Sequence, residues 1–223
     1  NTMMTSIFII GVGIVMWVLF GYSLSFSPSG NAFIGDLRWL GLEGVSLTEG
    51  YTDGASIPNM VFSAFQMMFA VITPALITGA VAGRMKFKSI FVFTIFWSLI
   101  VYYPLAHMVW GQGGLLGADG IGALDFAGGD VVHISSGVSA LVLCILLGKR
   151  HDYEHSIYRI HNIPTVVLGA SLLMFGWFGF NAGSALAADG LAAHAFMTTG
   201  VSAAAAMLSW MLCDIIKNKK PTL

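Results

Sequence analysis

Six long apolar stretches constrain this chain more than any other feature of its sequence. Each is long enough to cross a hydrocarbon core of about 30 Å as a helix. The stretches are continuous and do not alternate with polar residues, which favours helices over the strands of a membrane barrel. The sequence therefore predicts an all-α, polytopic transmembrane bundle extending over residues 1–223, with spans near 3–26, 58–83, 88–110, 130–148, 163–183 and 191–216.

Composition excludes the main alternatives to a membrane protein. Only 9% of the 223 residues are charged and 57% are hydrophobic, whereas a soluble domain carries roughly 25% charged residues. A net charge of −1 also excludes a nucleic-acid binder that relies on basic charge. We find no paired carboxylates, metal cluster or nucleophile with a neighbouring base, so we expect no enzyme, metal or cofactor.

Lys and Arg predict how the spans are oriented. If the first span runs outward, one side of the membrane holds nine of the ten cations and the other holds only Arg38. The positive-inside rule then places loops 84–87 and 149–162 and the tail 217–223 in the cytoplasm of a multi-pass cell-membrane protein. Most acids fall on the outer side, where they form either a solvated loop surface or a weak attraction for cations.

His133 lies in a strongly apolar run of the fourth expected span. An ionisable residue inside a membrane is a candidate functional group, because charge is costly there. A neutral imidazole can still both donate and accept a hydrogen bond. Position alone leaves two interpretations open, a packing histidine or a group that acts on a substrate.

The segment 124–130 leads into the same span with the sequence Leu-Asp-Phe-Ala-Gly-Gly-Asp. Its glycines permit an irregular backbone that exposes carbonyl groups. We expect Asp130 to cap the helix. Asp125 has two interpretations, an Asx turn or a fixed negative charge beside a cation-binding vestibule.

Three aromatic residues occupy positions that fit either structure or function. Trp110 lies where the third span meets the outer interface, as an aromatic-belt anchor would, but its ring also suits cation–π attraction for a small ammonium ion. Phe69 and Phe180 lie within the second and fifth spans, where such rings are ordinarily core or lipid-facing.

Together these residues resemble the Amt branch of the Amt/Mep/Rh ammonium transporter family. The likeness extends over essentially the whole chain. The matching stretches are Ala106–Gly111, Leu124–His133 and Gly176–Ser184, supported by Phe65, Gln66 and Phe69 and by Gly79–Arg84. The second and third of these stretches are the most specific.

The resemblance implies a role for each candidate residue. Trp110, Phe69, Ser184 and the carbonyl of Ala127 correspond to an outer site that receives ammonium. Asp125 corresponds to a buried acid that supports this site. The family role of Phe69 and Phe180 is a pair of stacked rings that close the pore, and His133 corresponds to the first of two histidines lining an apolar pore.

The likeness also implies departures from a complete transporter. Family members have roughly eleven helices in an inverted repeat, and the six spans correspond to the second to seventh. We therefore expect a partial fold that lacks the second pore histidine and does not transport alone. Gly83 stands where the family often has an acid before the arginine equivalent to Arg84, which removes an expected ion pair or cap.

Several functional expectations follow from the resemblance. The first is transport of ammonium or ammonia, with recruitment of the ion at the outer aromatic site, deprotonation, and passage through an apolar, histidine-containing pore. We expect the full-length protein to be a homotrimer surrounded by membrane lipid. The alternatives are an ammonium-sensing domain of a signalling protein and a neutral-gas channel of the Rh type. Loop 149–162 is expected either to meet a PII-type signalling protein or to be a solvated surface.

Overall fold

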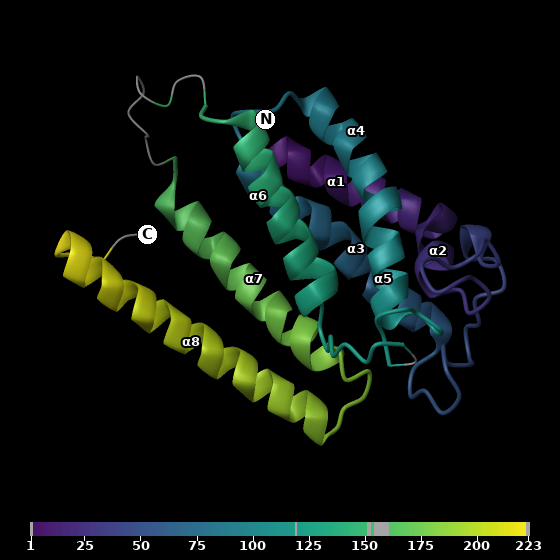
Figure 1. The fold of residues 1–223 in the computed structure, drawn as a ribbon. Coiled ribbons are helices and arrows are strands. Elements are labelled where there is room, and N and C mark those ends of the chain that lie inside the picture. The colour runs from purple at the N-terminus through teal and green to yellow at the C-terminus, as the bar shows by residue number, and fades with distance from the viewer. Residues whose placement is uncertain (1, 119, 151–152, 154–160, 222–223) are drawn as a thin grey trace. The chain divides into compact units, whose positions relative to one another are not determined.

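The computed structural model of the chain describes residues 2–118, 120–150, 153 and 161–221. Across these ranges the regular structure is helical, with one isolated bridge between Gly50 and Pro58 (Figure 1). The six expected apolar helices are present, which confirms the all-α fold, and their ends differ from the expected ranges by at most two residues. They are Met3–Phe26, Asn59–Val81, Phe87–Trp110, Gly129–Leu147, Ile163–Gly183 and Gly190–Asn218.

Three of these helices contain a π-helical segment. A π segment shifts the side chains after it around the helix axis, and such segments are frequent at functional sites. The candidate residue His133 lies in the third of them. The segmented helices are α1 (Thr2–Met16), η1 (Trp17–Gly21) and α2 (Tyr22–Phe26); α4 (Phe87–Trp97), η3 (Ser98–Tyr102) and α5 (Tyr103–Trp110); and η4 (Gly129–Ile134) and α6 (Ser135–Leu147).

The other three membrane helices are regular α-helices, although α3 contains Pro74. A proline removes one backbone donor and bends a helix unless neighbouring groups compensate. A short 3₁₀ turn, η2, lies in the loop before α3. Their bounds are η2 (Leu40–Leu42), α3 (Asn59–Val81), α7 (Ile163–Gly183) and α8 (Gly190–Asn218).

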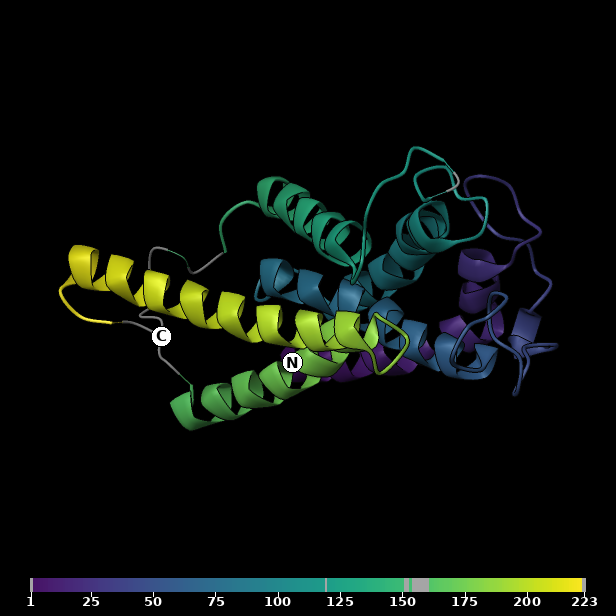
Figure 2. The same ribbon diagram turned by 90° about the horizontal axis from the view of Figure 1, so that it is seen from below.

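The chain divides into two compact units, Asn1–Ile157 and Tyr158–Leu223. In the first, α3 packs against both α1 and α6, and α4 packs against α1. In the second, α7 and α8 form an antiparallel pair that lies side by side in two perpendicular views (Figures 1 and 2). Each helix of the pair begins at a side-chain cap, Asn162 for α7 and Asp189 for α8.

A cluster of aromatic side chains fills one end of the first unit. Trp17 and Phe26 are almost wholly buried, with their ring centroids 6.2 Å apart. Phe62 packs edge-on against Phe26 at 5.1 Å and stacks on Tyr51 at 4.7 Å. The Trp17 Nε1–H donates to the carbonyl of Ser63 at 3.1 Å, so its polar atom is satisfied inside the cluster.

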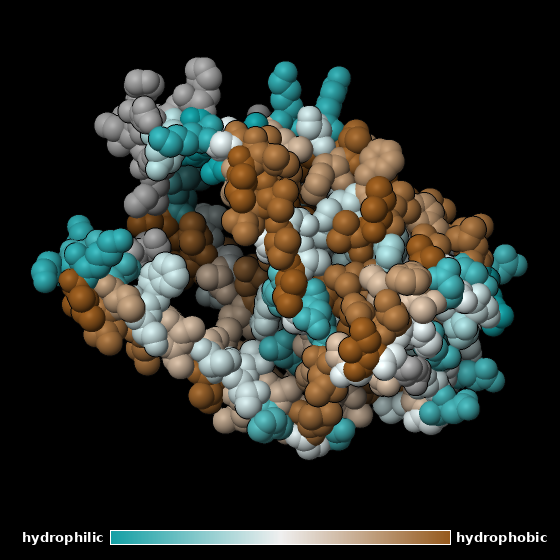
Figure 3. All heavy atoms as spheres, viewed as in Figure 1, coloured by the Kyte–Doolittle hydropathy of each residue, from teal (hydrophilic) through white to brown (hydrophobic). Residues whose placement is uncertain are grey.

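The helices expose apolar side chains on their outer faces (Figure 3). On α6 the exposed residues Val138, Leu141, Val142 and Ile145 recur at the spacing of one helical face. Water-soluble proteins rarely expose continuous apolar surface of this kind. It is the surface expected of a multi-pass membrane protein, whose helices meet lipid or further helices.

Candidate functional site

The carboxylate of Asp125 holds the segment that leads into η4. Its Oδ1 accepts hydrogen bonds from the backbone N–H groups of Gly128 and Gly129, at 2.5 and 2.8 Å. Its Oδ2 accepts from Asp130 and Val131, at 2.8 and 2.9 Å. A negative charge that satisfies four N–H groups at a helix N-terminus is favoured by hydrogen bonding and by the helix dipole. Asp125 is half-buried, less enclosed than its family counterpart is expected to be.

The expectation that Asp130 caps this helix is wrong. The N-cap residue is Gly128, in the left-handed conformation at a φ of +95°. Its carbonyl accepts from the N–H groups of both Val132 and His133, each at 3.0 Å. Because Asp125 has already bonded the preceding N–H groups, the first turn leaves Asp130 no orphan donor to cap.

Trp110 is fixed against the same loop and against α3. Its Nε1–H donates to the carbonyl of Asp125 at 2.9 Å. The ring of Phe69 meets the Trp110 ring edge-on, with centroids 5.5 Å apart and planes at 81°. Phe69 is 1% exposed, whereas Trp110 is half-buried and keeps part of its ring accessible. The hydrogen bond orients the indole, so the accessible part of its π surface is presented in a set direction.

Gly128 is a site residue that the sequence does not single out from its neighbour Gly129. A Cβ placed on Gly128 would lie 2.7 Å from Cγ2 of Val132 and 3.5 Å from Cδ1 of Phe69. The left-handed φ and this close approach both require glycine. A Cβ on Gly129 would meet nothing within 4 Å. The Gly-Gly pair itself is the only sequence signal for this requirement.

Within the first unit the structure thus brings together Phe69, Trp110 and Asp125. Ala127 lies in the loop that the Asp125 carboxylate closes, between Asp125 and Gly128. This arrangement can attract a cation through an aromatic ring and backbone carbonyls, and it has a fixed negative charge nearby.

His133 lies in η4, at the helix whose first turn Asp125 organises. Its side chain is exposed on the described chain, whereas the flanking residues Val131 and Val132 are fully buried. The rigid N-terminal turn therefore fixes the backbone that carries the imidazole.

Phe180 and Ser184 lie in the second unit, at the end of α7. The Ser184 hydroxyl donates to the carbonyl of Phe180 at 2.9 Å. Its single proton is therefore engaged, and its lone pairs are left to accept a hydrogen bond. The Phe180 ring stacks on Trp177 at 4.8 Å. Since this unit is described by itself, the pairing of Phe180 with Phe69 stays a prediction.

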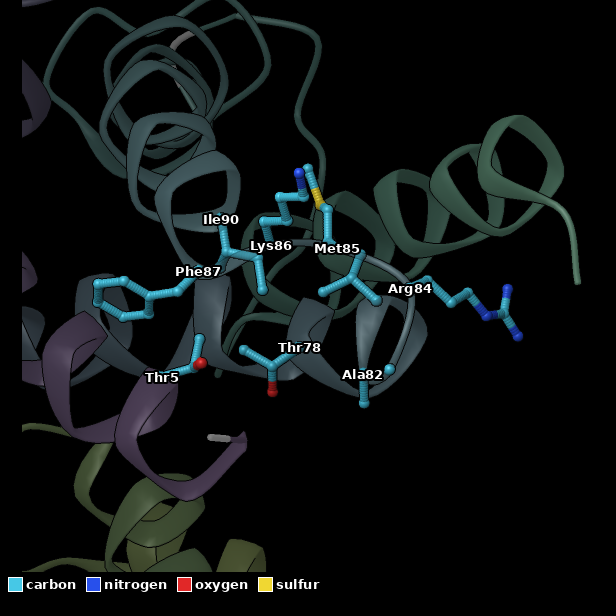
Figure 4. A pocket seen from close by; sticks show the side chains of 10 residues that line it. Thr5, Thr78, Ala82, Arg84, Met85, Lys86, Phe87 and Ile90 are labelled. Atoms are coloured by element: carbon cyan, nitrogen blue, oxygen red, sulfur yellow. The ribbon is translucent and has the colours of Figure 1, made fainter. Parts of the chain in front are cut away.

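The first unit also holds a cavity of about 540 Å³ that none of the candidate residues lines. It lies where α1 and α4 begin and α3 ends, at the opposite end of the third span from Trp110. Figure 4 shows Thr5, Thr78 and Ile90 around it, with Arg84 extending away. Beside it Gly83 has a φ of +71°, and a Cβ there would lie 3.0 Å from Cδ of Arg150. An arginine therefore packs where the family often has an acid.

Two further expectations concern loop 149–162 and metal binding. Most of loop 149–162, the expected docking surface for a PII-type protein, lies outside the described residues. Among the residues that are described, no three His, Cys, Asp or Glu side chains lie close enough together to hold a metal ion.

Comparison with known proteins identifies the chain's relatives. The model of the Ammonium Transporter Family matches residues 1–223. The ammonium transporter of Bacillus subtilis is 52% identical over 224 residues, covering 100% of this chain and 54% of the relative. The putative ammonium transporter of Methanothermobacter thermautotrophicus is 46% identical, with 100% and 53% covered.

Solved structures show the same fold. Mep2 of Saccharomyces cerevisiae superposes with a TM-score of 0.86 at 37% identity, covering 100% of this chain and 51% of that one. A structure described as a sensor Amt protein gives a TM-score of 0.79 at 29% identity, with 99% and 54% covered. The chain spans about half the length of the curated relatives it matches. With the family model matching its whole length, the chain belongs to the ammonium transporter family.

Proposed function

We propose that the protein to which this chain belongs carries ammonium across a membrane, and that Trp110, Phe69 and the loop closed by Asp125 receive the ion. The observation that supports this most is the joining of the three residues into one constellation. The Trp110 indole is bonded to the Asp125 carbonyl, and its ring meets Phe69 edge-on.

Recruitment in this proposal relies on the electron-rich face of Trp110. A small cation is attracted to an indole face most strongly where water is partly excluded. The lone pairs of the Ser184 hydroxyl and the carbonyl of Ala127 then accept hydrogen bonds from ammonium. Asp125 need not touch the ion, because its carboxylate acts by holding the loop.

Selectivity in this proposal comes from deprotonation. Ammonium and potassium have similar charge and size, but only ammonium can give up a proton and become neutral ammonia. Phe69 and Phe180 would close the pore beneath the outer site, and a bare cation is costly in the apolar passage beyond them. An uncharged imidazole at His133 would offer its lone pair to the released proton and its N–H group to ammonia.

The outer site is tested with Trp110→Leu in the full-length protein. We expect methylammonium uptake to fall by about tenfold at low substrate, the worth of one partly desolvated cation–π contact, and to recover at high substrate. Trp210→Leu is the matched control, because Trp210 is an exposed tryptophan on α8. Equal uptake by the two variants at low substrate would remove Trp110 from the site.

The pore assignment is tested with His133→Ala. Currents evoked by ammonium and by potassium are compared in the full-length protein, with the exposed His194→Ala as control. We expect His133→Ala to lower the ammonium current and its selectivity over potassium, while His194→Ala leaves both unchanged. An unchanged ammonium-to-potassium ratio in His133→Ala would contradict the assignment.

A second candidate function is ammonium sensing, which the likeness to the sensor Amt structure supports. Binding without transport would use the same outer site. Measuring ammonium binding and ammonium uptake on the same full-length preparation separates the two functions. Saturable binding that depends on Trp110, without uptake, would favour the sensor.

Assembly and partners remain part of the proposal. We expect a homotrimer in the cell membrane, with loops 84–87 and 149–162 and the tail 217–223 in the cytoplasm, and a PII-type partner at loop 149–162. Mass measurement in detergent tests the trimer.

Cysteine labelling of Lys88→Cys from each side of the membrane tests the orientation. Recovery of no PII-type protein under any nitrogen supply would count against the partner.

A further inference from the structure

His107 is a buried ionisable residue that the proposed function does not use. It lies in α5, one helical turn before Trp110, and is 1% exposed. Its Nε2 lies 2.8 Å from the carbonyl oxygen of Asn31, and its Nδ1 lies 3.1 Å from the carbonyl oxygen of Ser25. An ionisable side chain buried in a membrane helix is costly unless its polar atoms are satisfied, so these two partners carry information.

The two carbonyl partners compete for the proton of the His107 ring. A neutral imidazole has a single N–H group and can therefore donate to only one of two acceptors. We assign the proton to Nε2, because the contact from Nε2 to Asn31 is shorter than the contact from Nδ1 to Ser25. The Asn31 carbonyl is then the acceptor through which a neutral His107 holds its surroundings.

Asn31 begins a tight turn, residues 31–34, that its own side chain closes. Its Oδ1 accepts hydrogen bonds from two backbone N–H groups of the turn, at 2.8 and 3.2 Å. Its backbone N–H donates to the carbonyl of Ile34 at 3.0 Å, and the N–H of Gly35 donates to the carbonyl of Leu24, in α2, at 2.7 Å. The carbonyl that meets His107 therefore belongs to a closed turn that is itself attached to α2.

The same turn holds the chain on both sides of Trp110. His107 meets the turn three residues before the tryptophan. Five residues after it, the N–H of Leu115 donates to the carbonyl of Ala32 at 2.9 Å. These two attachments bracket the stretch of backbone that carries the indole ring.

The chain after Trp110 also fits closely around His107. The N–H of Gly111 donates to the His107 carbonyl at 2.9 Å and closes the end of α5. Gly111 has an ordinary φ of −72°, yet a Cβ there would lie 2.6 Å from Nδ1 of His107. Because closely packed groups transmit displacements to one another, a shift of the imidazole would move the backbone directly beside Trp110.

We propose that His107 is a positioning residue for Trp110. By bonding the Asn31 carbonyl it fixes the end of α5 against the turn 31–34, and it thereby sets the apparent affinity of the outer site for ammonium. This inference rests on the proposed transport function. In it His107 does not touch the ion. The Asp125 carbonyl orients the indole, and His107 holds the backbone from which the indole projects.

The test compares two amide variants of His107 in the full-length protein, reconstituted in vesicles, with methylammonium uptake measured against concentration. His107→Gln keeps a donor near the place of Nε2, whereas His107→Asn keeps one near the place of Nδ1. We expect His107→Asn to raise KM about fivefold, the worth of one buried hydrogen bond, with little change in maximal uptake. His107→Gln keeps the bond to Asn31 and should stay within about twofold of the wild-type KM.

A matched control breaks a hydrogen bond between other helices. The Trp97 Nε1–H donates to the Ser139 hydroxyl at 2.9 Å and joins α4 to α6. Ser139→Ala removes that bond. We expect Ser139→Ala and His107→Asn both to lower the melting temperature, and only His107→Asn to raise KM.

The outcomes separate this inference from the proposed function. A wild-type protein without uptake would overturn both. If the wild type takes up methylammonium and Trp110→Leu raises KM, but His107→Asn lowers only the melting temperature, the positioning role is wrong and the transport function stands. A KM raised in His107→Gln as much as in His107→Asn, or more, would overturn the bond to Asn31 as the cause.

Discussion

Two helices of this protein begin beside an aspartate, and the two aspartates behave differently. Asp189 is an ordinary N-cap, since its Oδ1 accepts one hydrogen bond, from Ala192 three residues later, at 2.9 Å. Asp125 stands three residues before the cap residue and accepts four, two at each oxygen. A cap of the first kind satisfies one backbone donor where a helix starts. The second kind fixes a whole loop, and here that loop carries the carbonyl that holds Trp110.

Asp125→Asn should have the largest effect on stability and on uptake. An amide keeps one acceptor oxygen, but its NH₂ group faces backbone N–H groups where Oδ2 stood. We expect a loss of about 2 kcal/mol in the free energy of unfolding and a fall of about tenfold or more in uptake, since two charge-assisted bonds are lost. Thermal unfolding and methylammonium uptake of the full-length protein measure the two effects.

Asp189→Asn is the control for that change. Asparagine caps helices as well as aspartate does, so we expect a stability change of at most a few tenths of a kcal/mol and normal uptake. Equal effects of the two substitutions would mean that Asp125 is an ordinary cap and that its loop does not organise the site.

Gly128→Ala should have the next largest effect. The added Cβ would lie 2.7 Å from Cγ2 of Val132 at a φ of +95°. We expect about 1–3 kcal/mol of destabilisation, because a left-handed residue with a Cβ is strained, together with a raised KM from displacement of the neighbouring Phe69 ring. Gly129→Ala is the control, since its Cβ meets nothing within 4 Å. The prediction fails if both alanine variants show the same KM.

A third carboxylate, Asp36 in the loop before α3, gives the smallest effect. A hydrogen bond from the Ser27 hydroxyl, helped by one from the Arg38 backbone N–H, lowers the pKa of Asp36 below its usual value. A lowered pKa in the folded state adds stability above the unfolded pKa of about 3.9, and that stability is lost as the pH falls through the folded value. The protection of loop 27–38 against hydrogen exchange, taken relative to the intrinsic exchange rate at each pH, should therefore fall below about pH 4.

Asp36→Asn provides the check on the pH effect. The protection of the loop in this variant, relative to the intrinsic exchange rate, should no longer change between pH 5 and the acid range, because the titrating group is gone. If the protection of the wild-type loop is the same throughout this range, the hydrogen bond from Ser27 contributes nothing to loop order.

Much of the fold could be predicted from the sequence because the membrane restricts the options. A chain that crosses a bilayer must satisfy its backbone internally, so a long apolar stretch becomes a helix whatever its neighbours are. The six helices accordingly lie where the apolar stretches are. The resemblance to the ammonium transporter family, and not residue type alone, identified Trp110, Phe69 and Asp125 as candidates, because an interfacial tryptophan and a phenylalanine within a span also have ordinary structural uses.

The hydrogen-bond partners within the site could not be predicted in the same way. The choice of Asp130 as the cap failed because capping preferences are local, whereas the actual ligand of the first turn is a carboxylate reaching across a loop. Which of two adjacent glycines must stay a glycine likewise depends on what packs against each.

The sequence by itself determined the all-helical membrane architecture, the number and extent of the spans and the residues worth examining. The architecture and the spans follow from hydrophobicity and helical length, which are properties of short stretches. The residues worth examining follow from the resemblance to a known family. Only the tertiary structure decided that Asp125 accepts hydrogen bonds from four backbone N–H groups, that Trp110 donates to the Asp125 carbonyl, and that Gly128 must remain a glycine. Those contacts depend on π-helical turns and on packing between helices far apart in the chain, which residue spacing does not encode.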